Sequence, residues 1–259
     1  MRMMKKVLGT VTVLALSVSL LAGCGSTAVS PVSSTASTAA ESTTSSVVSE
    51  TTSAAADENE AAAAQLLNDL TGSYQELWPV ILADEYKQTW LDDCTALVGE
   101  DNAEAAFEKL SSMVTGDVYG EDAVKAYANG GGAYFCGFTN SLATLTFDGE
   151  TSTISGTDKD GNVLFSHTYH YIGMEPVRGL YEFESDDADS GEFTYFFLAP
   201  DTSAETYHIE FRYGSDADAL SQYDAGVYAY WLASGISTDC DQTMIDNCIE
   251  LFCTENLAG

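Results

Sequence analysis

Apolar and polar positions alternate in short runs between residues 133 and 213, which is the two-residue period of a strand with one buried face. Asp148-Gly149 and Asp160-Gly161 each separate two such runs, and these dipeptides favour tight hairpin turns. The alternation predicts seven strands: Ala133–Phe138, Leu142–Phe147, Thr151–Gly156, Val163–Ile172, Val177–Glu184, Glu192–Leu198 and Tyr207–Tyr213. Consecutive hairpins of this kind are typical of a closed or nearly closed antiparallel barrel.

Apolar residues at helical spacing precede and follow these strands. The spacing predicts four helices before the barrel and one at the C-terminus: Glu58–Leu70, Leu77–Val98, Asp101–Val114, Glu121–Ala128, and a last helix that carries Cys248 and Cys253. The roughly 200 residues from 58 to 259 are enough for one domain with a proper core and too few for two. We therefore expect a mainly β domain with flanking helices.

The first 57 residues have a different composition. Residues 1–23 carry three basic side chains and then an apolar run of about 15 residues, the pattern of a secretory signal peptide. The run ends in Leu21-Ala22-Gly23-Cys24, which resembles a bacterial lipobox and implies a lipid on Cys24. Residues 24–57 are mostly Ser, Thr and Ala, which bury too little surface to fold, so we expect a disordered tether. These features predict a lipoprotein on the extracytoplasmic face of the cell membrane.

Charge and cysteine spacing exclude several classes of function. The chain has 9 Lys and Arg against 40 Asp and Glu, so nucleic acid and anionic membrane surfaces are disfavoured partners. Such a charge attracts divalent cations, although solvated acidic loops explain it as well. No Cys-x-x-Cys, phosphate-binding glycine loop or Gly-x-Ser-x-Gly turn occurs in the sequence, and we expect no enzyme. Cys248 and Cys253 lie about 140° apart around a helix and are poorly placed to bond each other.

His208 and Glu210 have the residue types of a metal site. In a strand, positions i and i+2 face the same way, so both side chains lie together while Ile209 and Phe211 face the other way. An imidazole and a carboxylate are two of the ligand types that zinc accepts. The alternative is that this face is simply the solvated side of an antiparallel strand. His167 and His170 are three residues apart, so they lie on opposite faces and do not form one site by themselves.

Residues 176–220, with Glu205-Thr-Tyr-His-Ile-Glu-Phe-Arg-Tyr-Gly214 as their core, resemble the ZinT (YodA) family of extracytoplasmic zinc- and cadmium-binding proteins. Asp69–Leu82 resembles the family's N-terminal segment, and Asp216–Trp231 resembles its helix and tyrosine-rich stretch. The resemblance covers roughly residues 60 to 255. It implies a lipocalin-like (calycin) antiparallel barrel.

In that family three histidines converge on the metal. Alignment on Gly214 places His208 and Glu210 at two of these positions. An ungapped count from Phe193 places Asp201 at the third, whereas an alignment on Ala199-Pro200 places Phe196 there. A phenylalanine cannot bind a metal. The resemblance therefore implies either a site of His208, Glu210 and Asp201 or a remnant with two ligands.

The predicted function is a membrane-anchored lipoprotein that captures zinc, or a cadmium-like divalent ion, and passes it to components of a zinc ABC importer. The alternative is an interaction or ligand-binding module on the same barrel with an eroded metal site.

The anchor gives the first prediction. Replacement of Cys24 by Ser removes the acylated atom, so the protein should leave the washed membrane fraction and appear in the soluble fraction, because the rest of the mature sequence has no apolar stretch long enough to hold it there. Immunoblots of fractionated cells measure this. A variant that stays in the membranes contradicts the lipobox.

Overall fold

The structure is a computed structural model, and it describes residues 58–200 and 208–258. The predicted signal peptide, the lipid site at Cys24, the predicted tether and Asp201 lie outside the described residues. Within the described part, no helix is both long and apolar enough to cross a membrane.

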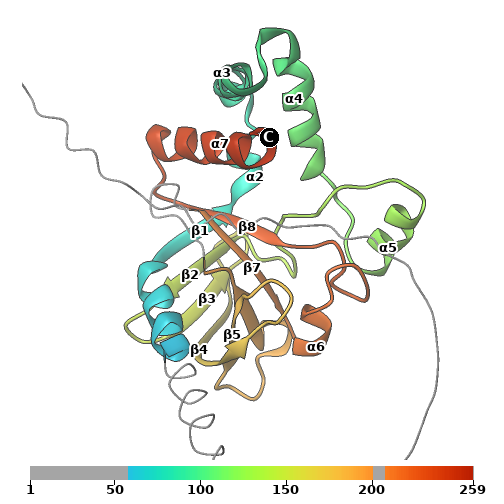
Figure 1. Cartoon of the computed structure of the whole chain (residues 1–259). Coiled ribbons are helices and arrows are strands. Elements are labelled where there is room, and N and C mark those ends of the chain that lie inside the picture. The colour runs from blue at the N-terminus through green and yellow to red at the C-terminus, as the bar shows by residue number, and fades with distance from the viewer. Residues whose placement is uncertain (1–57, 201–207, 259) are drawn as a thin grey trace, which may run out of the picture. The chain divides into compact units, whose positions relative to one another are not determined.

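Eight antiparallel strands form a closed barrel in which each strand pairs with the next in sequence (Figure 1). The strands are β1 Gly72–Glu76, β2 Thr144–Asp148, β3 Thr153–Thr157, β4 Val163–Met174, β5 Tyr181–Ser185, β6 Tyr195–Leu198, β7 His208–Gly214 and β8 Ala233–Ser237. Pairing of β1 with β8 closes the ring, with Tyr74 opposite Ser237 and Glu76 opposite Gly235. This up-and-down order is that of lipocalins, so the expected barrel with flanking helices is confirmed.

Aromatic side chains fill the interior of the barrel. Phe196 and Phe211 are fully buried, and the ring centroid of Phe196 lies 5.3 Å from that of Tyr213 and 5.4 Å from that of Tyr169. These contacts arise because inward positions on β4, β6 and β7 alternate with outward ones. The barrel is therefore a packed core rather than an open cup.

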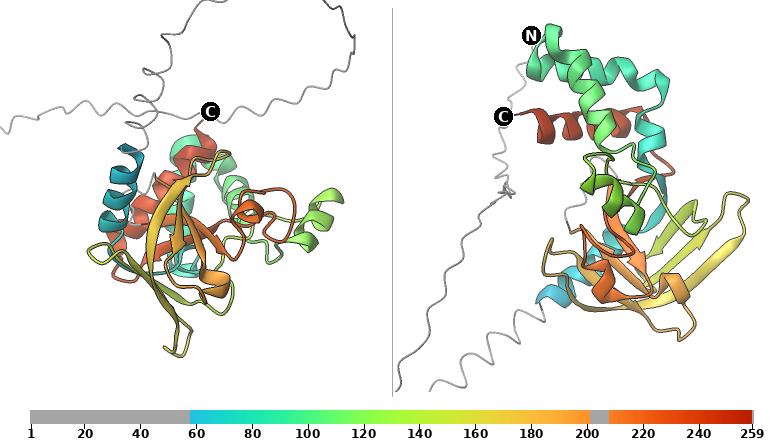
Figure 2. Two further views of the ribbon diagram at one scale, coloured as in Figure 1. Left: turned by 90° about the horizontal axis from the view of Figure 1, so that it is seen from below. Right: turned by 90° about the vertical axis from the view of Figure 1, so that its right-hand side faces the viewer.

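Helices lie together at one end of the barrel (Figures 1 and 2). They are α2 Leu77–Ile81, α3 Lys87–Val98, α4 Glu100–Met113 and α7 Gln242–Leu257, and they share a second core that includes the fully buried Trp90 and Ile249. The predicted helix over 77–98 is interrupted by a 3₁₀ turn at Asp84–Tyr86, and the Trp90 indole donates a hydrogen bond to the Ile81 carbonyl across that break, 2.7 Å. This helical layer places α7 above the outer face of β7.

The remaining helices lie outside this helical layer (Figure 1). The helix over residues 58–69 packs Leu66 and Leu67 on the barrel core, as its apolar spacing predicts. Gly149 lies so close to its last turn that a Cβ there would overlap the backbone of Asn68. The short helices are α5 Glu121–Ala128, at the predicted residues, and α6 Ala217–Leu220.

One predicted strand is wrong, and two strands of the barrel were missed. Residues 133–138 form an extended segment with isolated bridges from Phe135, and no strand of the barrel. The strands β1 and β8 were not expected. In β1 only Tyr74 is buried, and β8 has four consecutive buried residues, so neither shows the alternation that reveals a strand with one wet face. Closure by these two strands completes the barrel.

Arg212 is fully buried on the outer face of β7. Its guanidinium donates hydrogen bonds to the carbonyl oxygens of Leu220 and Tyr228 and to that of Gln222 at 3.3 Å, and it lies 4.3 Å from the centroid of the Tyr223 ring. Burial lowers the pKa of Arg212 from its usual value. The residues after β7 are thus held on the barrel through their backbone carbonyls.

Replacement of Arg212 by Met should lower the free energy of unfolding by about 3 kcal/mol, because it leaves buried carbonyl oxygens without their donor. Arg178 is the matched control, since it lies on the same Tyr223 ring, 4.5 Å from the centroid, but is exposed. Its replacement by Met should cost less than about 1 kcal/mol. Urea unfolding measures both; equal losses would contradict the role given to Arg212.

Candidate metal site

The two faces of β7 meet different surroundings. Ile209, Phe211 and Tyr213 enter the barrel core, while His208 and Glu210 are half-buried on the opposite face. Both line one hollow of about 70 Å³ between the barrel and the helical layer, together with Leu77, Trp78, Ile81, Cys248, Leu251, Phe252 and Glu255. The face that alternation assigned to His208 and Glu210 is therefore covered by α2 and α7 rather than open to solvent.

The donors of this hollow come from two elements that are far apart in sequence. Strand β7 supplies an imidazole and a carboxylate, and α7 supplies the thiol of Cys248 and the carboxylate of Glu255. In the segments 58–200 and 208–258, no three His, Cys, Asp or Glu side chains are grouped so that they could hold a metal ion. His208 and Glu210 thus supply part of a zinc ligand set, and the set needs a further ligand.

Burial is the main influence on the pKa of the two thiols near Glu210, and nearby carboxylates add to it. Burial, with added repulsion from Glu255 and Glu210, raises the pKa of Cys248 to about 12. Burial and the charge of Glu210 likewise raise the pKa of Cys136 to about 12. A cation in the hollow would have the opposite effect on these thiols, because it stabilises the thiolate.

Only one of the two residues considered for the third ligand position lies among the described residues. Asp201 belongs to the residues that the structure does not describe. Phe196 is fully buried inside the barrel opposite Tyr213, with its ring against Phe211 and Tyr213. Because β7 separates its inner from its outer face, Phe196 lies on the other side of the strand from His208 and Glu210.

The other two histidines form separate pairs on β4. Nδ1 of His167 lies 2.7 Å from a carboxylate oxygen of Asp187, and Nδ1 of His170 lies 2.8 Å from one of Asp186. The His167 side chain is 16% exposed and the His170 side chain is 51% exposed, in agreement with the predicted opposite faces. The structure therefore does not bring either of them into the hollow that His208 lines.

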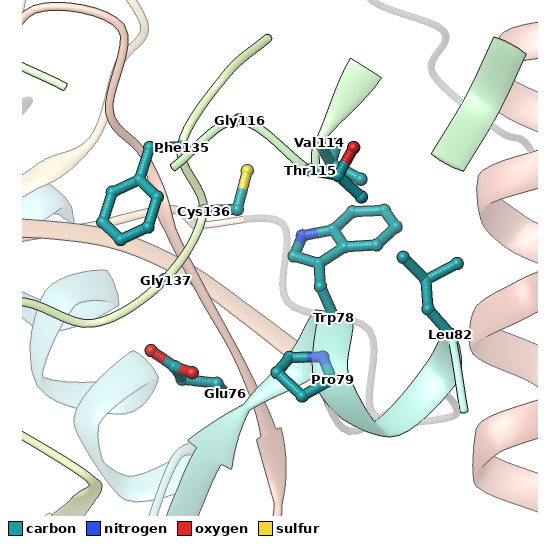
Figure 3. Close-up of a pocket in the computed structure, with 10 residues that line it drawn as sticks. All are labelled: Glu76, Trp78, Pro79, Leu82, Val114, Thr115, Gly116, Phe135, Cys136 and Gly137. Carbon is teal, nitrogen blue, oxygen red and sulfur yellow. The ribbon is translucent and has the colours of Figure 1, made fainter. Parts of the chain in front are cut away.

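A second hollow, of about 330 Å³, adjoins Trp78 and was not expected from the sequence (Figure 3). Its walls include Glu76, Leu82, Val114, Phe135 and Cys136. The Trp78 side chain is largely buried, and its indole nitrogen, on the ring edge facing Cys136 in Figure 3, has no hydrogen-bond partner among the described residues. No sequence pattern joins these residues, which come from three separate segments.

No family model matches the chain, and no curated protein matches it. Among solved structures, the Zn(II)-bound ZinT-like domain of Streptococcus pneumoniae AdcA is similar, with 16% identity and a TM-score of 0.45 over 71% of this chain and 89% of that domain. Zn(II)-bound AdcA from the same organism is similar at 14% identity and a TM-score of 0.41, over 74% of this chain and 35% of that one. Similarity at this level does not assign the chain to a family.

The raised thiol pKa values lead to a prediction about reactivity. At pH 8 the native protein should be alkylated by iodoacetamide at Cys240 at least about 10-fold faster than at Cys136 or Cys248, because the thiolate is the reactive form. Burial raises the pKa of all three thiols, to about 12 for Cys136 and Cys248, but Cys240 is only half-buried and so is more accessible. Mass spectrometry of the digested protein gives the three rates. Rates within a factor of a few of one another would show that these thiols are not held protonated by burial.

Proposed function

We propose that this domain binds zinc, or a similar thiophilic divalent ion, in the hollow between β7 and α7, with His208 and Glu210 as its ligands. The observation that carries the proposal is that both side chains line one partly enclosed hollow, with Glu255 and Cys248 on the facing helix. Zinc accepts nitrogen, sulfur and carboxylate oxygen, and all three donor types line this space. The two carboxyl groups of Glu210 and Glu255 that line the hollow also favour a cation.

Asp201 is the third ligand in this proposal. It precedes His208 by seven residues, so it belongs to the segment that joins β6 to β7. Three protein ligands leave one position of a tetrahedral zinc ion for water or an incoming group. Such an open position suits an ion that is cargo, since a second protein can bind the ion before the first set of ligands releases it.

The cargo role rests on the N-terminal residues. A lipid on Cys24 and a tether over residues 24–57 would hold the domain at the extracytoplasmic face of the membrane, next to the components of a zinc ABC importer. The excess of acidic residues would raise the local concentration of divalent ions there. We therefore propose capture of zinc outside the membrane and its transfer to the importer.

A second candidate function is a ligand-binding module, and the 330 Å³ hollow favours it. A mostly apolar space of this size with a buried indole N–H is typical of a small-molecule site. In this alternative His208 and Glu210 bind no metal.

Zinc titration by calorimetry, with bound metal measured afterwards, decides between the two. The wild-type protein should bind one equivalent, and His208→Ala should weaken binding by at least about 100-fold, because it removes the nitrogen ligand. His167→Ala is the control and should leave affinity unchanged, since His167 pairs with Asp187 outside the hollow. If wild type binds no zinc, cadmium or copper at micromolar concentration, the metal role fails and the ligand-binding module replaces it.

Two further measurements on the same protein test the ligand set. Affinity should fall as pH drops below about 6.5, because protons compete with the metal for the imidazole. Asp201→Asn should weaken binding if Asp201 is the third ligand. If this variant binds as wild type does, Asp201 is excluded and Glu255→Gln becomes the next variant to titrate.

A further inference from the structure

We propose that Cys94 and Cys253 form a disulfide bond that joins α3 to α7. Their Sγ atoms face each other at 4.0 Å, and both side chains are completely buried between the two helices. This inference concerns neither the metal nor the importer, and of the proposed function it uses only the extracytoplasmic location, so it stands if the metal role fails.

The geometry requires a small adjustment. A disulfide has an S–S distance of about 2.05 Å, so the two sulfur atoms must approach by about 2 Å, a shift that side-chain rotation and a slight movement of α7 can share. Close packing at this position already holds the thiols together, because Trp90 and Ile249 around them are also fully buried. Cys248 lies about 140° away around α7 and lines the hollow beside His208, so it does not compete for Cys94.

The chemistry needs a disulfide oxidant, which an extracytoplasmic compartment supplies as an oxidised thiol–disulfide oxidoreductase or a small disulfide. The two thiols lose two protons and two electrons and form one S–S bond, while the oxidant's disulfide opens to two thiols. Burial raises the pKa of both Cys94 and Cys253, so the folded domain contains little of the reactive thiolate. The bond therefore forms during folding, before α7 has docked.

The bond would fix one wall of the hollow at β7. Helix α7 contributes Phe252 and Glu255 to that wall, and side-chain packing in the second core holds it there. Cys253 lies on the same part of α7 as these two residues, and α3 is held in turn by the Trp90 hydrogen bond to Ile81.

Peptide mapping tests the bond directly. The reduced and unfolded full chain is refolded in a glutathione redox buffer, blocked with iodoacetamide and cleaved after glutamate. Cleavage at Glu85, Glu100, Glu250 and Glu255 places Cys94 alone in peptide 86–100 and Cys253 alone in peptide 251–255. We expect these two peptides as one linked species that separates on reduction. Alkylation of both cysteines, or a link from either to another cysteine, overturns the proposal.

Variants and heating give an independent measurement. Cys248→Ser should keep the link between the two peptides, and Cys94→Ser should abolish it. The oxidised wild-type chain should melt about 5 °C above the same chain after reduction, because the bond restricts the unfolded state. This comparison needs no substitution, so it also holds if Cys94→Ser fails to fold. An unchanged or lower melting temperature of the linked chain overturns the stabilising role.

Discussion

Backbone pairing between β1 and β8 brings the two ends of the folded chain together, and the site depends on it. The paired residues run from Tyr74 opposite Ser237 to Glu76 opposite Gly235. Glu76 adds a side-chain contact, since its carboxylate accepts a hydrogen bond from the Phe138 backbone N–H at 2.6 Å. Helix α2 begins directly after β1, and α7 follows β8 after a short turn. Barrel closure therefore places residues near 80 and near 250 side by side, and the helical layer above β7 is a consequence of that closure.

Strand β7 has no solvated face along most of its length. Its inner residues pack in the aromatic core, and on its outer face Arg212 is buried under the residues that follow the strand. Tyr223 connects this region to the β4–β5 turn, because its hydroxyl donates to Glu175 at 3.2 Å and the guanidinium groups of Arg178 and Arg212 both lie over its ring. Glu175 is itself fully buried and accepts two backbone N–H groups of its own turn. Charged groups inside this protein are thus compensated mainly by backbone and aromatic partners.

The pattern of apolar and polar residues predicted strands at β2 to β7 and missed β1 and β8. The four buried residues from Ala233 to Ile236 give β8 no alternation of apolar and polar positions. The segment around Phe135 was predicted as a strand, but it forms only isolated bridges and no ladder. The shared face of His208 and Glu210 follows from local geometry, so the sequence predicts it. The sequence does not predict that Trp78 and Glu255 line the same hollow, because their positions there depend on barrel closure and on the docking of α7. Long-range contacts of this kind leave no periodic signal in a single sequence.

The packed interior of the barrel determines the route by which anything bound at the hollow can leave. Phe196, Phe211 and Tyr213 occupy the space that an open barrel would offer to a ligand. An occupant of the hollow therefore lies against the outer face of the barrel. One side of the hollow is β7, which is hydrogen-bonded to a neighbouring strand on each edge. The other side is α7, which is held by side-chain packing. Anything that leaves the hollow therefore passes between β7 and the helices that cover it, and not through the interior of the barrel.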